Sequence, residues 1–81
     1  MNNKTTTYID ATGLTCPMPL MLLKQTMQDL PAGAKVCIEV TDVHAELDFQ
    51  IWCERFGHSL DRCHDNDSVM RFMVAKTQTV D

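Results

Sequence analysis

The fold of this chain is constrained most by a stretch of seven residues at positions 13–19, which has the sequence Gly-Leu-Thr-Cys-Pro-Met-Pro. A polar, strand-like segment precedes it and a periodic apolar segment follows it, so a turn from a strand into a helix is predicted here. Pro17 suits the N1 position, because its missing N–H has no intrahelical partner there, and Pro19 at N3 also lies within the first turn. Gly13 suits a tight turn. The helix is therefore predicted to begin just after Cys16.

Cys16 is the candidate reactive group of this stretch. Free N–H groups of Cys16 and Met18 and the positive end of the helix dipole are expected beside the thiol. Such surroundings favour a thiolate, so the pKa of Cys16 is predicted to lie below the ordinary value of about 8.5. The alternative is a cysteine that only caps an ordinary turn. We expect a nucleophile at Cys16, and a helix start that supports it through Gly13, Pro17, Met18 and Pro19.

Length and charge restrict the class of protein. Eighty-one residues, 44% of them apolar, predict one small domain over residues 1–81 with a thin core. A net charge of −4 with seven Lys and Arg argues against direct binding to nucleic acid. No apolar run has the length of a membrane span, and residues 1–7 contain no apolar signal core. We therefore expect a cytoplasmic protein that does not interact with membranes.

The cysteine spacing favours neither a metal site nor a disulfide framework. Structural disulfides are rare in a reducing compartment. No C-x-x-C pair occurs, and His64 next to Cys63 is too close for a normal pair of zinc ligands. We expect no metal and no cofactor. The four cysteines are Cys16, Cys37, Cys53 and Cys63.

Periodicity predicts the order β-α-β-α-β-β, with an ordered core over about residues 8–76. In residues 35–40 the apolar side chains alternate with others, which places Val36, Ile38 and Val40 inward and Cys37 on an open face. One apolar face implies a two-layer α/β sandwich whose helices cover one side of the sheet. The strands are predicted at 5–10, 35–40, 59–64 and 69–76, and the helices at 17–30 and from a cap at Asp42 to Phe56.

Each predicted helix has an apolar stripe. In the first helix, Met18, Met21 and Leu22 fall outside the stripe and lie next to Cys16. They are either ordinary exposed apolar area or a docking patch for a partner, to which methionine adapts well. The stripe of the first helix is Leu20, Leu23, Met27 and Leu30, and that of the second is Ala45, Phe49, Trp52, Cys53 and Phe56.

The pattern Gly13-Leu14-x-Cys16-Pro17-x-Pro19, preceded by Asp10 and followed by this element order, resembles the TusA/SirA-like sulfur carriers over about residues 8–76. Weaker support comes from Thr41-Asp42, Asp48, Trp52-Cys53 and Gly57-His58. The resemblance implies a mixed four-stranded sheet in the order 1-2-4-3, with the last strand antiparallel. Met18 stands where many members of the tRNA-thiolation branch have an acidic residue, Val43 follows Asp42 in place of a frequent proline, and Gln50 replaces another proline.

The resemblance also implies a function. Cys16 would accept sulfane sulfur as a persulfide from a protein donor, such as a PLP-dependent cysteine desulfurase or a rhodanese-like protein. It would then pass the sulfur to a cysteine of an acceptor protein, as in tRNA thiolation. We expect the chain to act as a monomer between these partners, with little catalysis of its own.

Two other classes of function stay open. One is a thiol redox or peroxide-sensing protein that uses Cys16, and the other is a non-catalytic interaction module in which the two prolines only shape the helix start. No second cysteine lies near Cys16 in the sequence, so an internal disulfide is not expected. No Cys-His-Asn constellation for hydrolysis is discernible either.

Overall fold

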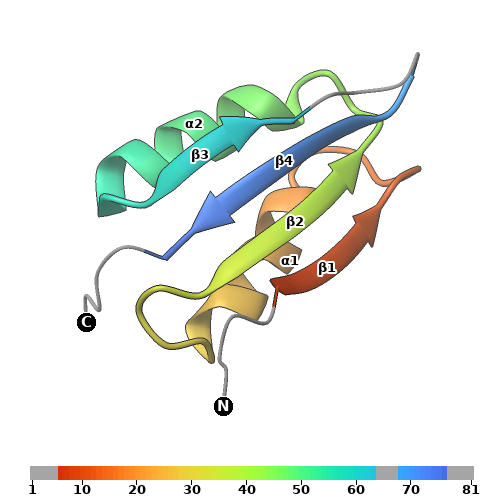
Figure 1. Cartoon of the computed structure of the whole chain (residues 1–81). Coiled ribbons are helices and arrows are strands. Elements are labelled where there is room, and N and C mark those ends of the chain that lie inside the picture. Colours follow the sequence, from red (N-terminus) through yellow and green to blue (C-terminus); the bar gives the residue numbers. More distant parts are fainter. Residues whose placement is uncertain (1–5, 64–67, 77–81) are drawn as a thin grey trace.

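The computed structural model describes residues 6–63 and 68–76, and these residues form six elements in the predicted order (Figure 1). The predicted turn at 65–68 and His64 fall largely outside the described residues. The elements are β1 (Thr6–Ala11), α1 (Met18–Gln28), β2 (Lys35–Val40), α2 (Ala45–Phe56), β3 (Ser59–Arg62) and β4 (Met70–Ala75).

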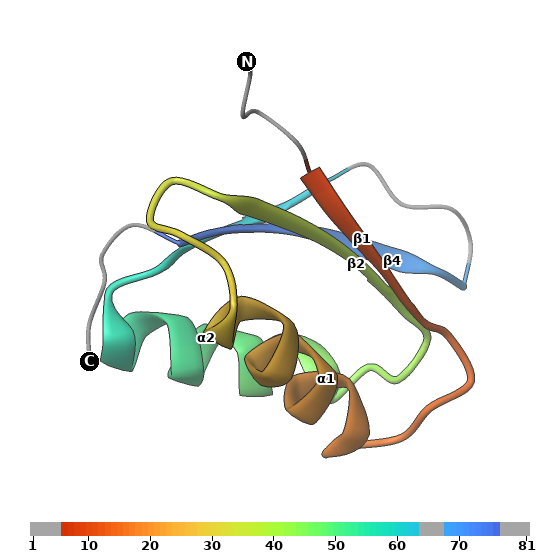
Figure 2. The same ribbon diagram turned by 90° about the horizontal axis from the view of Figure 1, so that it is seen from below.

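The four strands form one mixed sheet in the order β1-β2-β4-β3. β1 and β2 are parallel, whereas β4 runs antiparallel to both β2 and β3. Both helices lie on the same face of this sheet (Figure 2). The two-layer sandwich predicted from periodicity and the strand order implied by the family resemblance are both confirmed.

The core lies between the sheet and the helices, and β2 contributes more buried residues to its strand side than any other strand. Val36, Ile38 and Val40 are fully buried, as the alternation predicts. Phe49 of α2 contacts Phe72 of β4 edge to face, with ring centroids 5.5 Å apart. Each fully buried side chain of this size stabilises the fold by about 1.5–3 kcal/mol, so these contacts fix α2 against the sheet.

Cys37 is buried, with 4% of its surface exposed, so the expectation that it is open to solvent is wrong. Its side chain points to the face that carries no helix, as alternation requires. β2 is a central strand, however, and the register places Tyr8 of β1 and Met73 of β4 on either side of Cys37. A small side chain between two neighbouring strands therefore has little surface open to solvent.

The ends of the helices depend partly on distant residues. α1 ends at Gln28 rather than Leu30, and the Lys76 ammonium donates hydrogen bonds to the carbonyl oxygens of Met27 (2.8 Å) and Leu30 (2.7 Å). Gly57 ends α2 in the left-handed conformation, with φ of 76°. Glycine adopts that conformation without steric cost, and sequence therefore predicts this end well.

The start of α2 is close to the predicted one, and one residue of its predicted stripe is wrong. The helix begins at Ala45 with His44 at the N-cap position, and Asp42 accepts the N–H of His44 through Oδ1 and the N–H of Ala45 through its carbonyl oxygen. Phe56 does not belong to the buried stripe, because 41% of its surface is exposed at the last position of the helix. Trp52 is half-buried and lies against the ring of His58, at 5.0 Å between ring centroids.

Candidate functional site

Cys16 lies in the loop that joins β1 to α1, and polar contacts hold this loop in place. The Asp10 carboxylate accepts hydrogen bonds from the backbone N–H (3.1 Å) and the hydroxyl (2.6 Å) of Thr12. The N–H of Gly13 donates to the Thr41 hydroxyl at 2.9 Å. Gly13 has φ of +81°, which other residues rarely adopt, so the turn expected at this position is present and favours glycine.

The helix begins one residue later than predicted. Met18 is the first helical residue, Pro17 is the N-cap residue, and the Cys16–Pro17 peptide bond is cis. Pro19 occupies the second helical position, and it is also fully buried, so it anchors the helix start in the core. Cys16 therefore lies outside the helix, adjacent to its cap.

The N–H groups expected to be free beside the thiol are both in use. The N–H of Cys16 donates to the Asp42 carboxylate at 2.6 Å, and the N–H of Met18 donates to the carbonyl oxygen of Thr15 at 2.9 Å. The expected stabilisation of a thiolate by these groups is therefore wrong.

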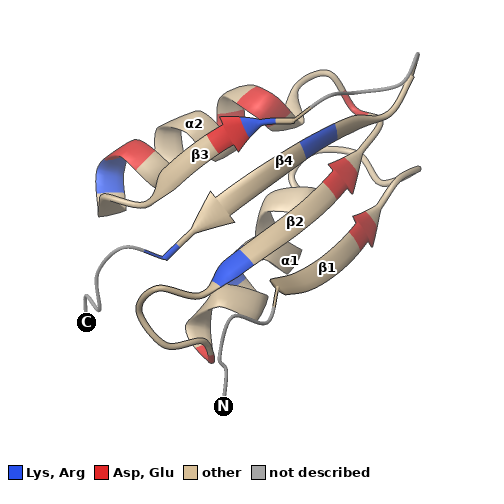
Figure 3. Ribbon diagram, in the orientation of Figure 1, with Lys and Arg blue, Asp and Glu red and all other residues tan. Residues whose placement is uncertain are grey.

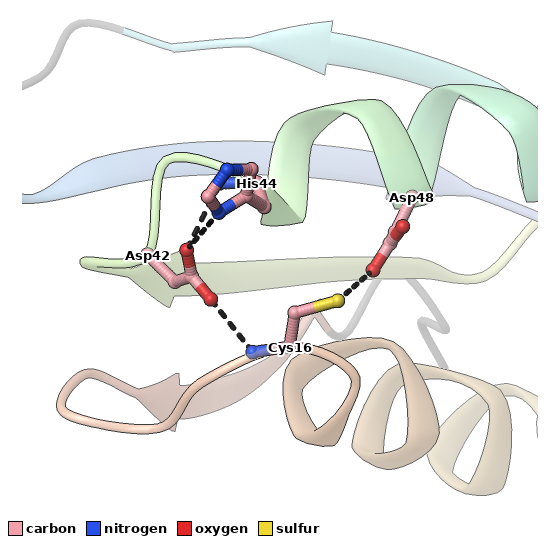
Figure 4. A network of polar contacts seen from close by, with 4 residues as sticks. All are labelled: Cys16, Asp42, His44 and Asp48. Atoms are coloured by element: carbon pink, nitrogen blue, oxygen red, sulfur yellow. Dashed lines mark hydrogen bonds and ion pairs between the residues drawn. The ribbon is translucent and has the colours of Figure 1, made fainter.

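Two carboxylates that are distant in the sequence enclose Cys16 instead (Figure 4). The thiol donates a hydrogen bond to Oδ2 of Asp48, in the first turns of α2, at 2.8 Å between Sγ and the oxygen. Asp42, in the loop between β2 and α2, accepts the backbone N–H of Cys16 through Oδ2. Its Oδ1 accepts the backbone N–H of His44 at 3.0 Å and contacts the ring Nδ1 of His44 at 3.2 Å.

The surroundings raise the pKa of Cys16, so the predicted lowering is wrong. The main cause is the hydrogen bond to Asp48, because a carboxylate that accepts the thiol proton stabilises the protonated form. Partial loss of hydration and the negative charges of Asp48 and Asp42 act in the same direction. At neutral pH the resting site therefore holds a thiol, with its proton directed at a carboxylate.

Charge is distributed unevenly around this site. Acidic residues lie at the carboxyl ends of β1 and β2 and at the start of α2 (Figure 3). This is the end of the sheet from which the chain enters the Cys16 loop. Hydrogen bonds from the backbone N–H groups of His44 and Cys16 lower the pKa of Asp42, so its charge is retained at neutral pH.

A groove of about 350 Å³ runs between the two helices, and Asp48 connects it to Cys16. Lys24 of α1 and Arg55 of α2 both line it, so its charge changes along its length from acidic to basic. Apolar lining is contributed by Leu20, Ile51 and Phe56.

The predicted docking patch is present only in part. Met18 and Met21 are 43% and 52% exposed, as expected. Leu22 is half-buried and packs against the core, so its assignment to an outward-facing patch is wrong. The spacing of apolar residues within α1 does not indicate this contact with the core.

Sequence reasoning missed the functional groups that come from α2 and the loop before it. Three exposed apolar residues recur there at intervals of four. Leu47 (59% exposed) and Ile51 (55%) lie on one side of α2, and Val43 (70%) lies in the loop before it. This spacing was visible in the sequence. The proximity of Asp48 and Asp42 to Cys16 had no local signal, because 32 and 26 residues separate them from it.

The other three cysteines are free and none is exposed. Cys53 is buried in the core as predicted, and burial raises its pKa to about 11. Cys63 is half-buried. Within residues 6–63 and 68–76, no group of three or more His, Cys, Asp or Glu could hold a metal ion, and no helix has the length and apolar character to cross a membrane.

A two-layer α/β sandwich with one exposed cysteine at the entry to its first helix defines a class of small thiol proteins. Within that class, the family model described as "Sulfurtransferase TusA" matches residues 7–76. The chain therefore belongs to the TusA family.

Individual relatives agree with this assignment. The chain is 32% identical over 68 residues to the sulfur carrier protein TusA of Pseudomonas putida, with 84% of this chain and 85% of that protein covered. It is 42% identical over 52 residues to the protein of the same name from Pseudomonas syringae, with 64% and 62% covered. A SirA-like protein from Desulfitobacterium hafniense has the same fold, with a TM-score of 0.80 at 23% identity over 91% of this chain and all of that one.

Proposed function

We propose that this protein is a sulfur carrier that holds sulfane sulfur as a persulfide on Cys16. The donor is a protein such as a cysteine desulfurase or a rhodanese-like protein, and the acceptor is a cysteine of another protein. The observation that carries the proposal is that Cys16 is the one exposed cysteine of the four and lies in the motif by which the chain resembles sulfur carriers. The relatives named sulfur carrier proteins support the same role.

The chemistry is thiol exchange. The Cys16 sulfur attacks the outer sulfur of the donor persulfide, the donor's S–S bond breaks, and the donor cysteine leaves with the electron pair. Discharge repeats the exchange, with the acceptor cysteine as the attacking group. Cys37 and Cys53 are buried and Cys63 is half-buried, so no exposed partner for an internal disulfide is present among the described residues. This supports transfer between proteins.

The peroxide-sensing alternative is less well supported. Thiols that react with peroxide are characteristically exposed and of low pKa. Cys16 is exposed, but its hydrogen bond to Asp48 raises its pKa, which disfavours peroxide oxidation and unassisted sulfur exchange alike. The relatives named sulfur carrier proteins therefore favour the carrier over the sensor.

We further propose that partners dock on the exposed apolar residues around the thiol. Met18 and Met21 from α1 and Leu47 and Ile51 from α2 are exposed, and Ile51 also lines the groove that Asp48 links to Cys16. A carrier has to bind two different partners in turn, and methionine side chains adapt to differently shaped surfaces. Exposed apolar groups next to a reactive centre are the expected signature of such a surface.

The destination that the family resemblance suggests is tRNA thiolation in the cytoplasm, with the chain acting as a monomer. The net charge of −4 supports delivery through a protein acceptor rather than direct contact of this chain with RNA.

Mass spectrometry tests the proposal. The protein is incubated with a cysteine desulfurase and cysteine, and in a separate reaction with hydrogen peroxide. A carrier gains the mass of one sulfur atom on Cys16 in the first reaction, and the Cys16→Ser variant does not. A sensor gains oxygen only in the second reaction, and an interaction module gains neither, so either result contradicts the proposal.

A further inference from the structure

We infer that Asp48 is a catalytic residue that accepts the Cys16 proton as sulfur is loaded and returns it to the departing donor. This inference rests on the proposed sulfur-carrier function, and it assigns a role to a residue that lies outside the motif around Cys16. The geometry is direct, since the Asp48 Oδ2 atom accepts the thiol hydrogen bond at 2.8 Å from Sγ. Asp48 comes from α2 and also lines the groove between the helices, so it lies where a donor would approach.

The thiol needs a proton acceptor because it is the wrong form for attack. Exchange requires a thiolate, or a thiol that loses its proton as the new bond forms. The hydrogen bond to Asp48 raises the pKa of Cys16, so the thiolate is scarce at neutral pH. A base within hydrogen-bond distance of the proton is the usual solution.

No other described group is as well placed. Both carboxylate oxygens of Asp42 already accept backbone N–H groups, from Cys16 and His44, and these bonds lower the pKa of Asp42 and weaken it as a base. The His44 ring contacts Asp42 rather than the thiol. Lys24 and Arg55, which also line the groove, have basic side chains that donate hydrogen bonds and do not accept them.

The Cys16 Sγ–H bond breaks and its proton moves to Asp48 Oδ2, while the sulfur lone pair forms a bond to the outer sulfur of the donor persulfide. The S–S bond of the donor breaks, and its electron pair leaves on the donor cysteine sulfur. Protonated Asp48 then gives the proton to that thiolate. The products are a persulfide on Cys16 and a thiol on the donor, and no external oxidant or reductant is needed.

This role separates two measurements that would otherwise change together. Asp48→Asn removes a negative charge beside Cys16, so it lowers the pKa of the thiol and increases the thiolate fraction. Alkylation by iodoacetamide, which follows the thiolate fraction, becomes faster. Sulfur loading from glutathione persulfide, a small donor that needs no docking surface, becomes slower by roughly 10-fold to 100-fold at neutral pH, because the larger thiolate fraction offsets part of the roughly 100-fold to 10,000-fold that a positioned general base contributes.

Glu54→Gln is the control. It also removes one negative charge from α2, but Glu54 is an exposed residue six positions beyond Asp48 in the same helix. The inference expects both alkylation and loading to be unchanged in this variant. If Glu54→Gln slows loading as much as Asp48→Asn does, the effect is one of general charge and the inference is overturned.

The pH dependence gives a second readout. Below the pKa of Cys16, which Asp48 raises, the wild type has the advantage of the base, whereas the variant depends on its thiolate fraction, which grows as the pH rises. The ratio of wild-type to Asp48→Asn loading rates therefore falls as the pH rises toward that pKa, and using a ratio cancels the titration of the probe. The His44 ring contacts Asp42 beside Cys16, so the series is repeated with His44→Gln in both backgrounds, where the same fall is expected. A ratio that does not change with pH contradicts the inference.

The outcomes distinguish the inference from the proposed function. If wild-type protein takes no sulfur from either glutathione persulfide or a desulfurase, the carrier proposal fails. If the wild type loads and Asp48→Asn loads at the same rate or faster, the carrier proposal stands and Asp48 has no catalytic role. Asp48 is half-buried, and Asp48→Glu provides a second variant that keeps the carboxylate and should recover part of the loading rate.

Discussion

Substitution of two cysteines by serine separates the reactive thiol from the structural one. Cys53 has 2% of its surface exposed and belongs to the core cluster, and burial raises its pKa to about 11. A serine hydroxyl in that apolar site costs about 1–3 kcal/mol of unfolding free energy. The cost is expected near 1 kcal/mol if the hydroxyl bonds to the carbonyl oxygen one turn earlier in α2. For a domain of this size, each 1 kcal/mol lowers Tm by about 4–8 °C.

Cys16→Ser should behave in the opposite way. Cys16 is exposed, and a serine hydroxyl can donate to Asp48 as the thiol does, so Tm is expected to stay within a few degrees of the wild type while sulfur loading is abolished. Thermal unfolding and loading measured by mass spectrometry on both variants check this pair. Cys53→Ala, which adds no polar group, controls for lost packing at Cys53. Loss of loading in Cys53→Ser at unchanged Tm would refute the assignment of roles.

Two further predictions follow from exposure and burial. Met21→Glu should leave the free energy of unfolding within about 1 kcal/mol of the wild type, and it should slow loading from a protein donor but not from glutathione persulfide. Leu22→Glu should instead lower Tm, because Leu22 packs on the core. Equal loading of Met21→Glu and wild type from two unrelated protein donors would contradict the docking surface. Burial, aided by the charge of Lys76, lowers the pKa of His58 below its unfolded value of about 6.5. The unfolded chain therefore binds more protons than the folded chain as pH falls, and the free energy of unfolding should decrease from about pH 7 to pH 5. Urea unfolding of His58→Phe across this range should show a smaller decrease. If the free energy of unfolding fell equally with pH in His58→Phe and wild type, His58 would be excluded as the cause.

The sequence predicted those features that depend on neighbouring residues in the chain. Alternation in residues 35–40 was sufficient to predict which side of β2 meets the helices, and the stripe containing Leu23 and Met27 was sufficient for α1. Gly57 indicated the end of α2, since the left-handed conformation at that position favours glycine. Cys16 could be singled out because the two prolines after it restrict the backbone to a helix start.

Features that depend on contacts between elements could not be predicted in this way. Cys37 is buried because β2 lies between two other strands, and Leu22 is half-buried because it packs against the core. The spacing of apolar residues within β2 or α1 does not indicate the burial of either residue. The clearest case is the thiol itself. Its local sequence indicated a lowered pKa, but packing of α2 beside α1 brings the Asp48 carboxylate within 2.8 Å of Sγ and raises the pKa. Short-range backbone preferences fix where the chain turns, whereas electrostatic interactions act through space, so only the tertiary structure decides which charges surround a reactive group.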